Sequence, residues 1–161
     1  MNQPSAPIAA NTPAKFVDDY LLYQLASASH FLSDEFHRQI KANGVKIHVW
    51  RVLACVVDQP GLMLTSLSKL VLYEQSRLTK IIDQMGDDGL VDKKPVAGDR
   101  RKMAIFITDK GRAIVTPLLE IAKQYELDAL KSVSRSERAI LIDILNKLRK
   151  HGELSKPHQV A

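Results

Sequence analysis

The stretch EQSRLTKIIDQMGDDGLVDKKPVAGDRRKMAIFITDKGR, residues 74–112, decides the fold. Over residues 74–88 the apolar side chains recur at helical spacing, which predicts an amphipathic helix that Gly89 ends; they are Leu78, Ile81, Ile82 and Met85. Residues 90–94 and 103–107 are candidate strands, and the turn-forming, basic segment between them predicts a hairpin.

The residues before this stretch predict two further helices. Residues 47–58 are apolar on most faces, which indicates a buried helix, and Gln59-Pro60-Gly61 ends it. A short extended segment at residues 62–64 follows, and we expect Thr65 to cap a short helix that carries Leu67 and Val71. Short helix, turn, longer helix and hairpin is the order of a winged helix-turn-helix, expected here over residues 46–108.

Long apolar-striped helices are expected on both sides of this unit. Residues 16–43 predict one helix of about 28 residues, roughly 42 Å long. Residues 109–150 predict a helix from the Thr108 cap to about Val133, bent or broken near Pro117, and a last helix with capping-box residues Ser134 and Glu137. These helices offer more apolar surface than the small winged unit can cover. We therefore expect the helices at the two ends of the chain to pair with those of a second copy.

The predicted fold is therefore mainly α with a small β-hairpin wing, a winged helix-turn-helix with long flanking dimerisation helices. The domain is expected to span residues 15–151. Residues 1–14, rich in Pro, Ala, Asn and Ser, are interpreted as a disordered tail, and residues 152–161 as a flexible tail.

Composition excludes several classes of protein. The 161 residues are 45% hydrophobic and 25% charged, which is typical of a globular chain. The net charge of +5 favours a polyanionic partner. The single cysteine cannot form an intramolecular disulfide, no apolar run reaches the roughly 18 residues of a membrane span, and residues 1–15 do not resemble a secretory signal. A cytoplasmic protein with no membrane partner is expected.

Catalytic chemistry has no support in the sequence. It contains no Gly-rich phosphate loop, no nucleophile elbow and no metal-ligand spacing. We therefore expect no enzyme activity, no catalytic residue, no metal and no cofactor.

The start of the helix over residues 74–88 is the candidate recognition element. Residues near the start of such a helix read base edges in the major groove, where Gln can pair with adenine and Arg with guanine. The candidates are Gln75, Ser76, Arg77, Thr79 and Lys80. The alternative is a solvated polar face on a surface helix.

The hairpin tip adds a second candidate DNA contact. Residues 93–102 hold five cations, Lys93, Lys94, Arg100, Arg101 and Lys102, against Asp99 alone. A basic wing can place an Arg in the minor groove or on phosphates. The alternative is a solvated charged turn, but its place directly after the candidate recognition helix favours DNA.

Five short motifs follow one another within residues 64–112: Leu67-Ser68, the run from Leu78 to Met85, Gly89-Leu90-Val91, Asp99-Arg100-Arg101 and Ile107-Thr108-Asp109-Lys110-Gly111. With these motifs the segment resembles the multiple antibiotic resistance regulator (MarR) family. Trp50-Arg51-Val52-Leu53 also fits the family pattern, and the resemblance covers roughly residues 16–150. Two positions depart from the family pattern: Ser68 stands where Ala is usual, and Tyr73 stands where Ser, Thr or Asp is more typical.

The resemblance implies a triangular homodimer on double-stranded DNA, at a pseudo-palindromic operator. Each subunit would place one recognition helix in a major groove and one wing in the minor groove. Arg101 matches the wing arginine and Asp99 its acidic partner. The implied DNA-binding residues are Thr65, Gln75, Ser76, Arg77, Thr79, Lys80, Asp99, Arg100, Arg101 and Lys102.

The family also implies a ligand between the dimerisation helices and the DNA-binding lobe. Residues 16–40 and 48–54 resemble members that respond to hydroxycinnamates or their coenzyme A thioesters. The implied effector-binding residues are His30, Phe31, His37, Arg38, Trp50 and Arg51. The alternative for each is core packing or surface charge.

The sequence thus predicts a transcriptional repressor released by a small aromatic effector. One alternative is an effector-independent architectural DNA-binding protein. Another alternative is a redox-sensing member of the family, although Cys55 lies on a mostly apolar helix, which favours a buried structural cysteine. A further one is a metal-sensing member, although no Cys or carboxylate cluster of suitable spacing joins His30, His37 and His48.

Overall fold

The computed structural model describes residues 16–96 and 98–154, the side chains of residues 100, 101, 153 and 154 excepted. The predicted tail at residues 1–14 and most of the one at 152–161 lie outside the described residues. The elements are α1 (Phe16–Asp19), α2 (Leu21–Ala42), α3 (Ile47–Asp58), β1 (Leu62–Met63), α4 (Leu64–Val71), α5 (Gln75–Asp87), β2 (Val91–Val96), β3 (Asp99–Ile107), α6 (Asp109–Ala129) and α7 (Arg135–Leu154).

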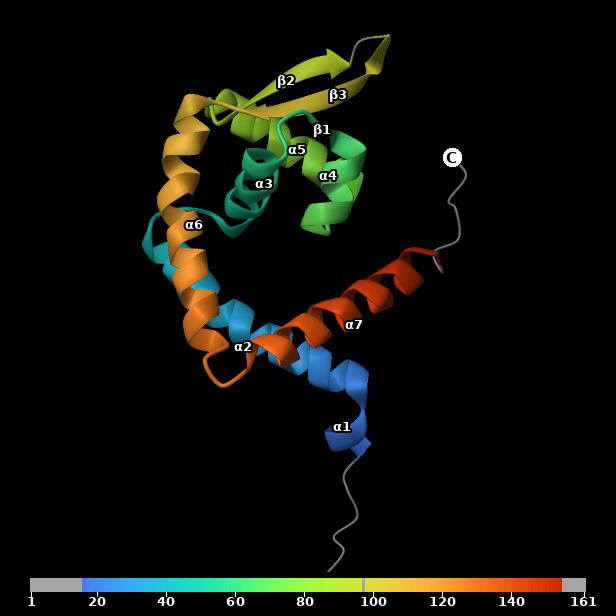
Figure 1. The fold of residues 1–161 in the computed structure, drawn as a ribbon. Coiled ribbons are helices and arrows are strands. Elements are labelled where there is room, and N and C mark those ends of the chain that lie inside the picture. The colour runs from blue at the N-terminus through green and yellow to red at the C-terminus, as the bar shows by residue number, and fades with distance from the viewer. Residues whose placement is uncertain (1–15, 97, 155–161) are drawn as a thin grey trace, which may run out of the picture.

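The described residues form a winged lobe and a helical arm (Figure 1). The lobe contains α3, α4, α5 and the sheet, from which the β2–β3 hairpin projects. The arm contains α1, α2 and α7, and α6 runs from the lobe to the arm. The prediction of a mainly α fold with a small hairpin wing and long flanking helices is confirmed.

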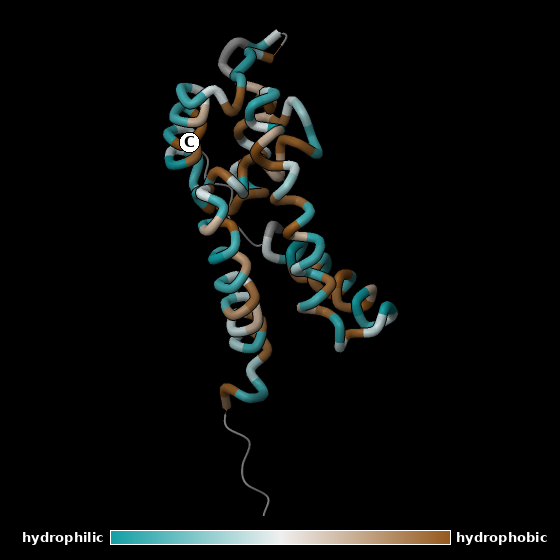
Figure 2. The backbone as a smooth tube through the Cα atoms, turned by 90° about the vertical axis from the view of Figure 1, so that its left-hand side faces the viewer, coloured by the Kyte–Doolittle hydropathy of each residue, from teal (hydrophilic) through white to brown (hydrophobic). Residues whose placement is uncertain are grey.

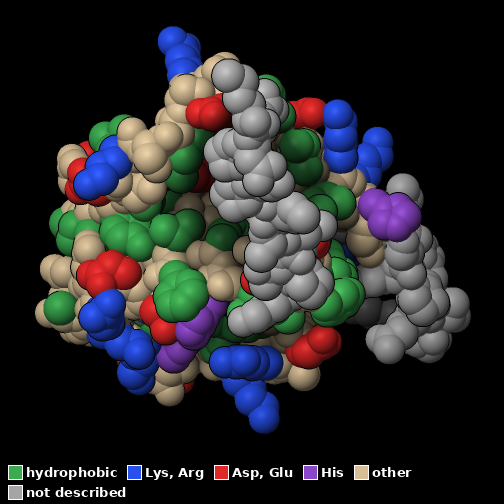
Figure 3. All heavy atoms as spheres, turned by 90° about the horizontal axis from the view of Figure 1, so that it is seen from below, with side chains coloured by type: hydrophobic (Ala, Val, Ile, Leu, Met, Phe, Trp, Pro, Cys, Tyr) green, Lys and Arg blue, Asp and Glu red, His purple; other side chains and the backbone are tan. Residues whose placement is uncertain are grey.

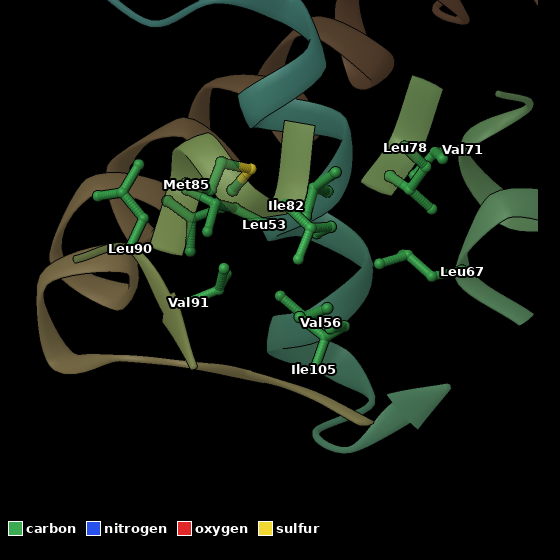
Figure 4. Close-up of a cluster of buried hydrophobic side chains, with 12 residues drawn as sticks. Leu53, Val56, Leu67, Val71, Leu78, Ile82, Met85, Leu90, Val91 and Ile105 are labelled. Atoms are coloured by element: carbon green, nitrogen blue, oxygen red, sulfur yellow. The ribbon is translucent and has the colours of Figure 1, made fainter. Parts of the chain in front are cut away.

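A single apolar core holds the lobe together (Figure 4). Its fully buried side chains come from the three helices and the central strand of the lobe and include Leu53 and Val56 of α3, Leu67 of α4, Leu78 and Ile82 of α5, and Ile105 of β3. Burying each such side chain contributes roughly 1.5–3 kcal/mol. The predicted inner stripe of α5 is thus confirmed, and it fixes the opposite face of α5 toward solvent.

The sheet is antiparallel in the order β1-β3-β2. Leu62 of β1 pairs with Ile105, and Val91 of β2 pairs with Ile107. The hairpin is longer than the predicted strands at 90–94 and 103–107, because an irregularity between Pro95 and Val96 lets pairing resume beyond the proline. Residues 95–102, which the sequence predicts to be a turn-forming basic tip, are therefore mostly strand.

The predicted single helix over residues 16–43 is wrong at its beginning. Tyr20 has extended backbone angles and separates α1 from α2. The side-chain amide of Gln24 donates to the carbonyl oxygens of Val17 and Asp18, both at 3.0 Å, and so satisfies acceptors that the break leaves open. The predicted stop at Asn43-Gly44 is confirmed, with Gly44 at φ 74°.

The predicted cap of α4 is wrong. Thr65 lies inside the helix, which begins at Leu64, and Met63 occupies the cap position. Helix α6 is not broken at Pro117 but continues through it, which leaves a bend as the other part of that prediction. The missing N–H of this proline affects only the carbonyl of Ala113, at an exposed position that water reaches.

The other predicted caps are confirmed. Thr108 accepts a hydrogen bond from the backbone N–H of Gly111 at 3.0 Å, and it donates to the carbonyl of Gly89 at 2.8 Å. At α7 the carboxylate of Glu137 accepts from the backbone N–H of Ser134 at 2.8 Å. Helix α7 then continues to Leu154, three residues into the predicted flexible tail.

Hydrophobic residues recur along the helices of the arm (Figure 2), and many of the large ones are exposed. Phe31 of α2 is 71% exposed, and Ile140 of α7 is 59% exposed. From below, hydrophobic side chains gather between charged ones on this end of the molecule (Figure 3). Among the described helices, none is long and apolar enough to cross a membrane.

Candidate nucleic-acid interface

A tight turn between α4 and α5 sets the direction of the candidate recognition helix. Leu72 adopts the left-handed conformation at φ 58°, which is uncommon for a residue with a side chain. The backbone N–H of Tyr73 donates to the carbonyl of Ser68 at 3.1 Å. Together these features end α4 and begin α5 within three residues.

The outer face of α5 carries the predicted contacts. Gln75, Ser76, Arg77, Thr79 and Lys80 are all exposed, opposite the buried stripe. The hydroxyl of Thr79 donates to the carbonyl of Gln75 at 2.9 Å, which leaves its oxygen free to accept from a ligand. The structure therefore brings these five side chains together on one accessible surface. Thr65 is exposed within α4, the neighbouring helix of the pair.

Tyr73 is a feature that the sequence reasoning missed. The guanidinium carbon of Arg77 lies over its ring, 4.4 Å from the centroid, and that of Arg51, from α3, lies at 5.7 Å. Both distances fall within the range of cation–π attraction. Arg51 was expected to bind an effector, yet it faces the start of α5. The departure from the family pattern at residue 73 was the one available signal.

Burial, followed by positive charge near the start of α5, lowers the pKa of His48 on α3. Its pKa lies below the ordinary value of 6.5, chiefly because burial disfavours the imidazolium, with Lys46 and then Arg77 adding repulsion. Arg77 therefore acts electrostatically on α3.

The wing is tied to α5 by an ion pair. The ammonium of Lys93 on β2 lies 2.6 Å from the carboxylate of Asp83 on α5. Lys94 lies over the ring of Phe106, 4.9 Å from its centroid, and Lys102 lies 3.4 Å from Asp99. The side chains of Arg100 and Arg101 lie outside the described residues, so the pairing of Asp99 with Arg101 stays a prediction.

The predicted effector residues are spread over α2 and α3, and their role stays a prediction. His30, Phe31 and Arg38 are exposed on α2, and Arg38 pairs with the neighbouring Glu35. His37 is half-buried, and burial followed by repulsion from Arg51 lowers its pKa. Trp50 packs edge-on against Phe36, with ring centroids 5.4 Å apart.

Two hollows lie elsewhere. One, of about 230 Å³, lies between α2 and α6 and is lined by Leu32, Ser33, Phe36, Ala122 and Tyr125. Another, of about 190 Å³, lies behind α5, and its lining includes Lys46, His48, Ile81 and Gln84. None of the six predicted effector residues lines either one.

The first hollow has an aromatic wall that the sequence did not reveal. The rings of Phe36 and Tyr125 lie 5.6 Å apart, and the Tyr125 hydroxyl donates to the carbonyl of Leu32 at 2.7 Å. In the sequence Phe36 is one apolar residue of a long predicted helix, and Tyr125 lies too far along the chain for any spacing to connect the two. An apolar hollow with an aromatic wall suits a planar ring.

Metal binding and thiol chemistry are the two alternatives that the described part of the chain allows us to examine. No three His, Cys, Asp or Glu side chains gather there in a way that could hold a metal ion. Cys55 is half-buried, and burial, followed by repulsion from Asp58, raises the pKa of its thiol. A raised pKa lowers the thiolate fraction and with it the reactivity of the thiol.

Known proteins match this architecture. The sequence profile of the MarR family matches residues 47–103. A solved MarR family transcriptional regulator from Silicibacter pomeroyi DSS-3 is 40% identical, with a TM-score of 0.73 over 83% of this chain and 98% of its own. This chain belongs to the MarR family. It is therefore a DNA-binding transcriptional regulator and not an enzyme.

Two further proteins of lower identity extend the comparison. The transcriptional regulator PecS of Dickeya dadantii is 31% identical over 81 residues, which are 50% of this chain and 49% of PecS. The solved structure of Bordetella bronchiseptica BpsR, whose DNA binding is regulated by 6-hydroxynicotinic acid, is 22% identical, with a TM-score of 0.72 over 84% of this chain and 96% of its own. At that identity the likeness to BpsR shows the fold alone.

Proposed function

We propose that this MarR-family chain is a homodimeric repressor that binds a pseudo-palindromic operator and is released by a small aromatic effector. The observation that carries the DNA-binding part is the exposed polar start of α5 beside a basic hairpin. The buried stripe of α5 holds that face outward, and the pair between Lys93 and Asp83 ties the hairpin to it.

The chemistry of this surface suits duplex DNA. Gln75 and Arg77 can each form two hydrogen bonds with a base edge, and Lys80 can contact a phosphate. The hairpin adds Lys94 and Lys102 and, from the sequence, Arg100 and Arg101. Sequence is read in the major groove by α5, and the wing adds affinity through charge.

The apolar arm supports a second copy as partner. Helix α7 exposes Ile140, Leu141, Ile144, Leu145 and Leu148, all between 40% and 59%. Leu21 and Leu22 of α2 are each 58% exposed. A chain that exposes so much contiguous apolar surface needs a partner to cover it, and in a dimer these helices bury one another.

A planar aromatic acid suits the hollow between α2 and α6. Phe36 and Tyr125 offer ring faces there, and Ser33 offers a hydroxyl. The regulation of BpsR by 6-hydroxynicotinic acid gives a precedent for an aromatic acid as effector. For this chain we propose a hydroxycinnamate or its coenzyme A thioester, which acts by favouring a spacing of the two α5 helices that does not fit DNA.

Selection from a random duplex library tests the DNA-binding proposal. The expected product is an inverted repeat whose half-sites lie about one helical turn, roughly 10 bp, apart. Recovery of no common sequence would support the architectural alternative and contradict sequence-specific repression.

Titration calorimetry tests the effector. Hydroxycinnamates and their thioesters are titrated into the protein with and without operator DNA, and by linkage DNA must weaken ligand binding by the factor with which ligand weakens DNA binding. Phe36→Ala should lower ligand affinity, whereas Phe16→Ala, at an exposed position outside both hollows, is the matched control. Binding that leaves operator affinity unchanged would contradict the release mechanism.

A further inference from the structure

A tyrosine ring at the turn of the helix-turn-helix pair connects two arginines from different helices. Tyr73 is half-buried and packs against the lobe core. Its backbone is fixed by the hydrogen bond to Ser68 and by the left-handed Leu72 before it. The ring is thus a rigid platform beside the exposed start of α5.

Arg77 lies over the Tyr73 ring. Its guanidinium lies 4.4 Å from the ring centroid, although the side chain is exposed and belongs to the first turn of α5. A long flexible side chain loses conformational freedom when it binds a base, and a ring that already restrains it reduces that loss. Stacking leaves the donors in the guanidinium plane available for hydrogen bonds.

Arg51 acts on the same ring from the other helix. Its guanidinium lies 5.7 Å from the Tyr73 centroid. Among the described residues, neither Arg51 nor Arg77 has a carboxylate within ion-pair distance. The Tyr73 ring is therefore a shared contact of two arginines that carry like charges.

We propose that Tyr73 is a specificity-determining positioning residue, whose ring orients Arg77 toward one base in each half-site. The proposal rests on the proposed function, since it requires α5 to read DNA. It assigns to Tyr73 no contact with DNA of its own. Loss of the ring would let Arg77 sample many orientations and reach phosphates as easily as the base edge.

The test compares the operator, single-base variants of its half-sites and a scrambled duplex, by fluorescence anisotropy. Tyr73→Phe keeps the ring, and Tyr73→Leu keeps apolar packing without it; if Tyr73→Leu fails to fold, Tyr73→Met replaces it. Phe106→Leu is the matched control, because Lys94 lies over that ring in the wing of the same lobe. Arg77→Ala and the double variant complete a mutant cycle.

Tyr73→Phe is expected to bind the operator within about twofold of the original protein. Tyr73→Leu should bind it roughly 3- to 30-fold more weakly, the range that corresponds to one cation–π contact. Binding to the scrambled duplex should change less than about twofold. Base preference should relax at the position that Arg77→Ala relaxes, and Tyr73→Leu should add nothing in the Arg77→Ala background. Phe106→Leu should leave that preference intact.

Three outcomes would overturn the inference. Equal losses on operator and scrambled DNA would make Tyr73 a structural residue alone, and so would losses that multiply with those of Arg77→Ala. If Arg77→Ala leaves operator binding unchanged, the proposed base contact of Arg77 fails and the inference fails with it. If Arg77→Ala weakens binding but Tyr73→Leu does not, only the inference fails.

Discussion

A Cβ atom on Gly111 would lie 2.2 Å from the carbonyl oxygen of Leu90. Gly111 is in the first turn of α6, and Leu90 follows α5, so the glycine marks the place where the arm-bearing helix meets the end of the recognition helix. Thr108, which caps α6, also donates to the carbonyl of Gly89. The Thr-x-x-Gly motif therefore joins the beginning of α6 to the segment that follows α5 by direct contact.

Gly111→Ala is expected to destabilise the protein by about 3 kcal/mol or more, because the added methyl meets backbone as well as Ile107 and Leu53. The control is Gly86→Ala within α5, where a Cβ would lie 3.8 Å from the nearest atom and the helix should gain roughly 0.5–1 kcal/mol. Urea unfolding measures both. Equal stabilities for the two variants would contradict the close approach.

Features fixed by neighbours in sequence were predictable. Helix α3 begins and ends at the predicted residues, and the caps at Thr108 and Ser134 follow from side chains that act within one turn. The stripe of α5 follows from apolar spacing alone. Such features depend on local propensity, which the sequence displays directly.

Features that depend on distant partners were not predictable. The approach of Arg51 to the Tyr73 ring requires α3 to lie beside the turn before α5, and the pair of Phe36 and Tyr125 requires α2 to cross α6. The six predicted effector residues, taken from two segments by resemblance, line neither hollow, and their role stays a prediction.

The wing should contribute charge and little sequence preference. Arg101→Ala is expected to weaken binding to operator and unrelated DNA alike and to lower the salt slope by about one charge per subunit. Lys93→Ala should lower the slope less, because Asp83 lies 2.6 Å from its ammonium. Anisotropy titrations over a series of salt concentrations measure both slopes. An unchanged slope for Arg101→Ala would exclude Arg101 from the interface.

Assembly should depend on the apolar face of α7. Leu145→Glu is expected to weaken the dimer at least about tenfold, since burying an unpaired carboxylate costs more than 1.4 kcal/mol. Removal of residues 134–161 should abolish the dimer, whereas removal of residues 1–14 should leave it intact. Sedimentation velocity distinguishes these species. A well-folded, soluble monomer that lacks residues 134–161 would contradict the proposed interface.

Stability should fall in mild acid because of His37 and His48. The folded protein lowers the pKa of both below 6.5, chiefly by burial, so the unfolded chain takes up protons more readily there. The free energy of unfolding is therefore expected to decrease as pH falls through about 6.5. His37→Gln/His48→Gln should flatten this dependence in urea unfolding between about pH 5 and 7, with exposed His30→Gln as control. An equally steep dependence in the double variant would assign the effect to other groups.

The ratio of affinities for operator and scrambled duplex, measured at one fixed salt concentration, tests sequence-specific DNA recognition most directly. The proposed reading of base edges by α5 predicts that the protein binds the selected operator at least about 10³-fold more tightly than the scrambled duplex. It also predicts that Arg77→Ala reduces this ratio while leaving the salt slope largely unchanged. A ratio near one for the original protein would contradict the account.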